Sequence, residues 1–319
     1  MSWFFLALIC MIGWGCADLF YKKGTDDSDR YSHLKIAVWV GLVMGVCSFA
    51  LMPFAETPVQ TGSLLSNALK YTPASLSYII SMVIGYAGLR YLELSIVSPI
   101  QNASGAMSAI FMLVFFVITG RINDISEEFA ALQWVGVVFI VAGVIALAAV
   151  ERKLSVDDTQ ETDKKYKSGA LALFFPLAYC LFDTIGTAAD GIILDEETGL
   201  GLGEIDVLVL YGLTFLLAGI ICYVFLWIKE GKPYNPFARS ERSKGVAACC
   251  EECGQVFYVY AMAKEPVLAA PMVASYCIIS VILSRIFVKE KLKATQYACV
   301  ISVITGIVIL GICDGIYGD

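Results

Sequence analysis

Long stretches of uncharged, mostly apolar residues recur along the chain, and they constrain its fold more than any other feature. A helix needs about 20 apolar residues to cross the roughly 30 Å hydrocarbon core of a bilayer. In lipid every backbone polar group must be paired within the protein, so these stretches are predicted to be helices and not isolated strands. They occur at Ile36–Ala55, Tyr71–Leu89, Leu94–Gly120, Phe129–Val150, Val207–Ile228, Pro266–Ser284 and Ala294–Cys313.

The composition supports a membrane location. Charged residues make up 16% of the chain and hydrophobic residues 58%, whereas soluble domains carry about 25% charged residues. The apolar start, Met1–Ala17, has no basic segment before it and no small-residue cleavage site after it. We therefore expect it to be a retained first membrane helix and not a signal peptide.

Ten helices account for the apolar pattern. The expected fold is an all-α integral membrane protein with ten transmembrane helices, and the charged segment 151–167 is the expected linker between two halves, 1–150 and 168–319. The expected helices lie near residues 2–20, 34–54, 72–91, 95–119, 128–150, 168–189, 206–228, 244–263, 266–287 and 293–314.

The two halves resemble each other, which indicates an internal duplication. Chance similarity between apolar helices is the alternative. Five helices per half is an odd number, so the second half would enter the membrane from the opposite face and the two repeats would be inverted. Three pairs of segments occur in the same order: Trp14–Asp18 with Tyr179–Asp183, the segments ending at Pro99 and Pro271, and Gln133–Leu147 with Gln296–Leu310.

Basic residues are distributed unevenly between the two membrane faces. In the ten-helix topology all but three of the 22 Lys and Arg residues fall on one face, the exceptions being Lys70, Arg121 and Lys264. Cytoplasmic loops carry the excess of Lys and Arg. The pattern therefore predicts that both termini lie outside the cytoplasm.

Two acidic residues in the expected eighth helix are the strongest candidates for function. Glu251 and Glu252 lie within the apolar segment 247–260. Ionisable groups at membrane depth are costly and suggest a substrate or ion site. Because adjacent helical residues point about 100° apart, we expect at most one of the two to face a central cavity squarely, where it could bind a proton or the cationic part of a solute. If the helix began later, both would be ordinary interfacial charges.

A second set of candidates is polar or aromatic. Asp18 and Asp183 occupy equivalent places in the two halves and either act as matched gates or are interfacial carboxylates. Buried amides need hydrogen-bond partners, which could come from a solute or from neighbouring helices. The remaining candidates for the cavity wall are Gln101, Asn102, Tyr258, Tyr276, Trp14 and Tyr179, although aromatic residues also gather at membrane interfaces.

No cofactor or metal site is predicted. The cluster Cys249, Cys250 and Cys253 lies within about one helical turn, and the only histidine is His33. This spacing does not offer four ligands to a soft metal. The sequence contains no nucleotide-binding motif and no nucleophile elbow.

Three motifs carry a resemblance to a known family. They are ALICMIGWGCADLFYKKG (7–24), LRYLELSIVSP (89–99) and KEKLKATQY (289–297). In this order they resemble the EamA-type branch of the drug/metabolite transporter superfamily over essentially the whole chain. The connection TGRINDISEEFAALQW (119–134) departs from the family's basic GERL form because it is acidic. The resemblance implies a central cavity between the halves, alternating access, and a solute among amino acids, sugars, nucleotide sugars and other metabolites.

The expected function is secondary active transport of a small polar metabolite across the cytoplasmic membrane of a bacterium. The expected partners are that solute and the lipid bilayer, with a proton as a candidate coupling ion; nucleic acid is not expected, and the chain would be a monomer or a homodimer. The rival functions are a membrane enzyme acting on a lipid-linked substrate and a non-transporting membrane scaffold or sensor. The cavity is expected between the first, third, fourth, sixth, eighth and ninth helices, with the fifth and tenth at the periphery.

Overall fold

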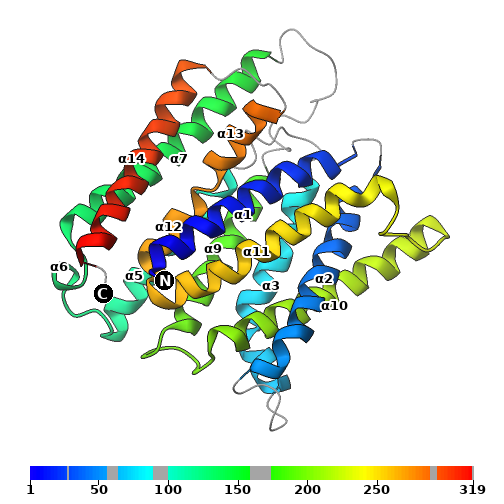
Figure 1. The fold of residues 1–319 in the computed structure, drawn as a ribbon, viewed down its shortest axis with the longest axis horizontal. Helices are drawn as coiled ribbons and strands as arrows, with labels where there is room; N and C mark the ends of the chain where they lie inside the picture. Colours follow the sequence, from blue (N-terminus) through cyan, green and yellow to red (C-terminus); the bar gives the residue numbers. More distant parts are fainter. Residues whose placement is uncertain (27–28, 56–63, 89–99, 159–173, 288–292, 318–319) are drawn as a thin grey trace.

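Helices account for all the regular structure in the described part of the chain, which comprises residues 1–26, 29–55, 64–88, 100–158, 174–287 and 293–317 of a computed structural model (Figure 1). Two short 3₁₀ turns, Met52–Phe54 and Arg239–Glu241, accompany the α-helices. The α-helices are α1 (Trp3–Gly24), α2 (Ser32–Leu51), α3 (Leu64–Gly88), α5 (Ser104–Thr119), α6 (Ile125–Glu128), α7 (Ala131–Asp158), α9 (Phe174–Leu194), α10 (Glu204–Glu230), α11 (Arg242–Lys264), α12 (Pro266–Ala274), α13 (Cys277–Phe287) and α14 (Ala294–Tyr317).

The helices are those of a multi-pass membrane protein. Within the described residues, 7 segments are long and apolar enough to cross a bilayer. α5 is apolar but shorter, and α3 and α11 fall outside this set. Large apolar side chains also point outward, as expected where lipid replaces water. Examples that are more than half exposed are Phe49, Ile110, Ile118, Ile228 and Ile301.

The helices pack mainly in pairs that are far apart in sequence. α1 lies along α11, α3 along α9, α2 along α10, α5 along α12, and α7 along α14 (Figure 1). Small residues allow the backbones of paired helices to approach closely. A Cβ added at Gly41 of α2 would lie 2.9 Å from the Cα of Gly219 on α10, and one added at Gly136 of α7 would lie 3.1 Å from the carbonyl oxygen of Gly306 on α14.

The helix expected over 266–287 is not continuous. It is broken at Ser275–Tyr276 into α12 and α13. Pro271 has no N–H to donate to the preceding turn. The Ser275 hydroxyl donates to the Met272 carbonyl at 2.5 Å, a local bond that competes with the helical ladder. A second turn, at Asn102–Ala103, precedes α5, so the stretch expected as one helix over 95–119 is also interrupted.

Several expected boundaries shift. α7 continues to Asp158, so the first part of the expected linker 151–167 is helical, and α9 continues to Leu194 beyond the expected end at residue 189. Four of the expected features lie outside the described residues: the rest of that linker, the helix starts expected at 95 and 168, the segment 89–99 and residues 289–292.

Candidate functional site

A small cavity lies near the middle of the helix bundle. It has about 60 Å³ of space, enough for a few waters, since one water needs about 10–15 Å³ measured in this way. Its walls come from α1, α3, α5, α9, α11 and α12, which correspond to the six expected helices, and from Tyr211 of α10 in addition. The polar and aromatic lining residues are Trp14, Asp18, Tyr21, Tyr78, Tyr86, Gln101, Asn102, Ser104, Tyr179, Asp183, Thr187, Tyr211, Glu251, Gln255, Tyr258 and Tyr276.

Glu251 lines this cavity and Glu252 does not. α11 begins at Arg242, more than two turns before Glu251, so Glu251 is inside the bundle, with 9% of its surface exposed. The Tyr21 hydroxyl donates to its carboxylate, and the Trp14 indole donates to its backbone carbonyl at 3.2 Å. Glu252 instead accepts from the Cys47 thiol on α2. The helical turn thus separates the two acids.

Asp18 and Asp183, which the sequence pattern placed in equivalent positions, each bond to a serine from the other half of the chain. The Ser280 hydroxyl on α13 donates to Asp18 of α1 at 2.9 Å. The Ser104 hydroxyl at the start of α5 donates to Asp183 of α9 at 2.6 Å. Both carboxyls also line the cavity. Asp18 is therefore bonded to α13, which follows the break at Ser275–Tyr276, and Asp183 to α5, which follows the turn at Asn102–Ala103.

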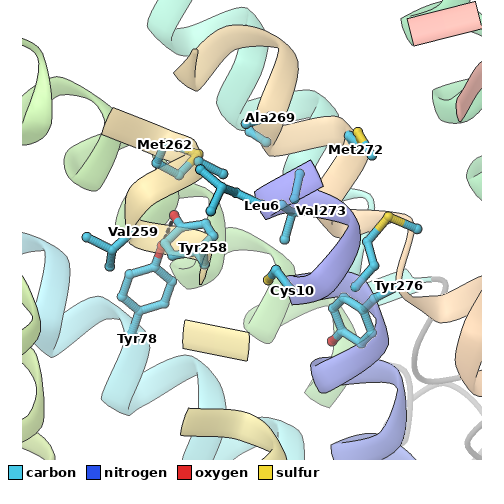
Figure 2. Packing of buried hydrophobic residues seen from close by; sticks show 14 of the residues in the cluster. Leu6, Cys10, Tyr78, Tyr258, Val259, Met262, Ala269, Met272, Val273 and Tyr276 are labelled. Carbon is cyan, nitrogen blue, oxygen red and sulfur yellow. Dashed lines mark hydrogen bonds between the residues drawn. The ribbon is translucent and has the colours of Figure 1, made fainter. Parts of the chain in front are cut away.

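Eight aromatic rings surround the cavity, seven of them tyrosines. The Trp14 ring lies 5.1 Å from the Tyr258 ring and 5.7 Å from the Tyr276 ring. The Tyr78 and Tyr258 hydroxyls are joined by a 2.6 Å hydrogen bond (Figure 2). Tyr179 packs against Gly85, where an added Cβ would lie 2.6 Å from the tyrosine ring.

Two buried amides in the cavity wall have unused donors. The side-chain nitrogens of Gln101 and Gln255 have no hydrogen-bond partner among the described residues, and these side chains are 6% and 1% exposed. Asn102 bonds to the Tyr276 hydroxyl. An unpaired buried donor is costly, so these amides are suited to hydrogen-bonding a guest. Gln255 was missed from the sequence although it follows Glu251 by one helical turn.

Comparison with known proteins shows a family likeness in the second half of the chain and a fold likeness over nearly all of it. The model of the EamA-like transporter family matches residues 198–312. This part of the chain has the EamA-like transporter sequence pattern. The match covers α10 to α13 and most of α14 and confirms the resemblance there. The comparison with curated proteins gave no match. One solved structure, described as "Crystal structure of protein", aligns with a TM-score of 0.63 at 10% identity, over 97% of this chain and 96% of that chain. At this identity the likeness shows a shared fold alone.

A second, larger cavity of about 1120 Å³ lies at the end of the bundle that holds both chain ends. We call it the vestibule. It is lined by Met1 and Tyr317 and carries many acidic side chains and few basic ones. The acidic residues are Glu127, Glu128, Asp195, Glu196, Glu197, Glu204, Glu265 and Asp314.

Ion pairs and burial set the charge of the vestibule wall. Arg121 pairs with Glu128 at 3.3 Å, Asp195 at 3.2 Å and Glu197 at 3.7 Å. Burial alone would raise the pKa of Asp195, but hydrogen bonds from Thr198 and the Arg121 guanidinium outweigh it and lower that pKa. Burial, with a smaller contribution from Glu128, raises the pKa of Glu265 to about 7.

One buried acid outside the cavity lining was also missed. Asp190 of α9 has 0% of its surface exposed, and it accepts a 2.8 Å hydrogen bond from the Tyr71 hydroxyl of α3. It escaped notice because the sequence pattern ended this helix at residue 189, which placed Asp190 in a loop.

Proposed function

We propose that the chain is a secondary transporter for a small polar solute that carries a positive charge. One observation carries this proposal: the central cavity is lined by three carboxyl groups and eight aromatic rings, with no Lys, Arg or His among its lining residues. Aromatic faces attract cations, most strongly when water is excluded. The carboxyl groups of Asp18, Asp183 and Glu251 add opposite charge, and the amides of Gln101 and Gln255 offer hydrogen bonds to the polar part of the solute.

Glu251 is the candidate coupling group. An unpaired charged acid at the centre of a membrane helix costs roughly 2.5–3.5 kcal/mol on insertion scales. Either a proton or the cationic solute relieves that cost, and the two would compete for the same carboxyl. Exchange of a proton for the solute, with the cavity opening alternately to each side, would drive transport. The family name that matches the second half is that of a transporter, which supports transport over enzymatic activity.

Two inverted five-helix repeats, 1–150 and 168–319, would supply the two alternating states. Helix packing supports this arrangement. If each helix is replaced by its counterpart in the other repeat, the α1–α11 pair becomes the α9–α3 pair. The α2–α10, α5–α12 and α7–α14 pairs stay the same, because the members of each pair are counterparts. The Asp18–Ser280 and Asp183–Ser104 bonds likewise each join the first helix of one proposed repeat to the fourth helix of the other. On this basis α3, α5 and α11 also cross the membrane, giving ten spans.

The proposed orientation places both termini outside the cytoplasm of a bacterial cell. Met1 and Tyr317 line the same vestibule, so the chain ends lie at one end of the bundle. In the ten-helix topology all but three of the 22 Lys and Arg residues fall on the face opposite the termini, and the excess of Lys and Arg marks the cytoplasmic face. A reporter that is active only in the cytoplasm should remain silent when fused to the C-terminus.

Reconstituted protein tests the proposed transport. A panel of small primary, secondary and quaternary amines is screened for thermal stabilisation in detergent, and those that bind are tested for uptake into proteoliposomes. Glu251→Gln should abolish the pH dependence of uptake. Glu252→Gln is the matched control, because this adjacent acid does not line the cavity, and it should transport normally. Uptake of neutral or anionic solutes alone, or equal effects of the two variants, would refute the proposal.

A further inference from the structure

Asp190 is a buried acid for which the transport mechanism above has no use. Its side chain is fully buried between α9 and α3. The Tyr71 hydroxyl donates to Oδ1, while Oδ2 has no hydrogen-bond partner among the described residues. No salt bridge to Asp190 is found in the described part of the chain. The Tyr78 and Tyr258 hydroxyls also lie close to this carboxyl, but the described residues pair it with no cation. A buried carboxylate without a cation is costly to charge.

The groups that face Asp190 are almost all hydroxyls. α3 contributes Tyr71 and Tyr78, α11 contributes Tyr258, and α10 contributes Tyr211. Asp183 on its own helix adds repulsion. α5 and α12 contribute apolar atoms here, because Met112 and Pro266 pack against the next residue, Gly191. Among the described residues, the surroundings of Asp190 are therefore polar, and none of these neighbours carries a positive charge.

Asp190 also lies between the two cavities. On one side Thr187, Tyr78 and Tyr258 line the central cavity, and the two tyrosines are hydrogen-bonded to each other (Figure 2). On the other side Leu194, one turn further along α9, lines the vestibule. The Tyr78 hydroxyl also donates to Thr187 at 3.2 Å. The Tyr78 and Tyr258 hydroxyls, which line the central cavity, therefore also lie close to this carboxyl.

We propose that Asp190 is a proton-binding site, protonated while α3 and α9 are packed together and deprotonated when they separate and water reaches it. A proton on Oδ2 removes the charge that this dry setting cannot balance. When the α3–α9 seam opens, water solvates the carboxylate and takes up the proton. The proposal rests on the proposed function in one respect, that opening of this seam is a step of transport.

Infrared difference spectroscopy of the purified full chain tests the protonation state without any solute. Around neutral pH the wild type should show a protonated-carboxyl band that is lost in Asp190→Asn. Tyr71→Phe should shift the same band, because the carbonyl oxygen loses its donor. Tyr86→Phe is the matched control: this buried tyrosine of α3 bonds to Tyr21 instead and should leave the band in place. If Asp190→Asn removes no band, Asp190 is ionised and the proposal is wrong.

Backbone hydrogen exchange tests the link to the seam. After correction for the intrinsic rate, exchange of the α3 and α9 amides should accelerate in the wild type between about pH 6 and about pH 9, the range in which buried acids can titrate. Asp190→Asn is permanently neutral and should lose this acceleration. An identical pH response in both proteins would overturn the proposal. Because neither measurement uses the solute, failure here leaves the cation-transport proposal standing, and failure of cation uptake leaves these two outcomes unaffected.

Discussion

Gly254 offers a direct test of how tightly the cavity wall is packed. It lies on α11 beneath the indole ring of Trp14, and a Cβ added there would come within 2.6 Å of the indole Nε1 and closer still to Cδ1. Real Cβ atoms do not approach other heavy atoms so closely, so Gly254→Ala must displace Trp14. Because that ring also packs on Tyr258 and bonds to the backbone of Glu251, its displacement should deform the cavity.

The size of the effect follows from two opposing terms. Overpacking a closely packed interior costs about 1–3 kcal/mol. Replacing glycine by alanine in a helix returns up to about 1 kcal/mol. Gly315→Ala isolates the second term, because Gly315 lies in α14 with nothing within 4 Å of an added Cβ. The difference between the two variants therefore estimates the clash.

Unfolding in detergent, followed by tryptophan fluorescence, measures both variants. Gly254→Ala should be about 1–3 kcal/mol less stable than Gly315→Ala and should bind the amine found by screening more weakly. If the two variants are equally stable and bind equally well, Trp14 is not packed against α11 and the cavity wall described above is wrong.

Three further predictions concern single interactions. Ser104→Ala removes the short hydrogen bond to Asp183 and should reduce the free energy of unfolding by about 1.5–3 kcal/mol, the range for hydrogen bonds to charged groups; an unchanged denaturation midpoint would contradict it. Because the pKa of Glu265 is raised to about 7 in the fold, the wild type should lose stability as the pH rises from about 4.3 toward that value. Glu265→Gln should flatten this part of a stability–pH curve. An identical curve for the variant would refute the raised pKa of Glu265. The pKa of Asp195 is lowered in the fold, so its contribution to stability is present above its unfolded pKa and is lost as the pH falls through the folded value. Arg121→Gln should reduce this loss of stability in acid by no more than about 1 kcal/mol, because the ion pair is partly exposed. A larger effect, or none, in the same titration would count against the ion pair.

Much of the fold could be predicted because lipid imposes one simple rule. Backbone groups must be paired within each segment, so apolar length alone located helices such as α2, α10 and α14. The same rule does not say where a helix breaks when its polar groups find other partners. The break at Ser275 depends on a side-chain bond and on Pro271 four residues earlier, and the apolar pattern runs through it without interruption.

Some residues of the candidate site could be predicted from the sequence and others could not. Glu251 and Asp183 stood out because charge is conspicuous in an apolar segment. Tyr211 and Gln255 did not, because tyrosine and glutamine occur in many membrane helices and only packing shows which of them line a cavity. Asp190 was missed through an error of a few residues in the end of α9. At that boundary a small error in length changes an acid from a solvated loop charge into a buried one.

Asp190 lies between the central cavity and the vestibule, and the tyrosines packed around it form a dry layer that has an electrical consequence. Water-filled spaces conduct ions and carry little of the membrane potential, so the potential falls mainly across the dry parts of a membrane protein. The layer formed by Tyr71, Tyr78 and Tyr258 around Asp190 is one such part. Moving one elementary charge across the full potential is worth about 2.3 kcal/mol per 100 mV. A proton that moves between Asp190 and water would cross part of this dry region and experience part of that energy, which would make proton binding at Asp190 sensitive to voltage.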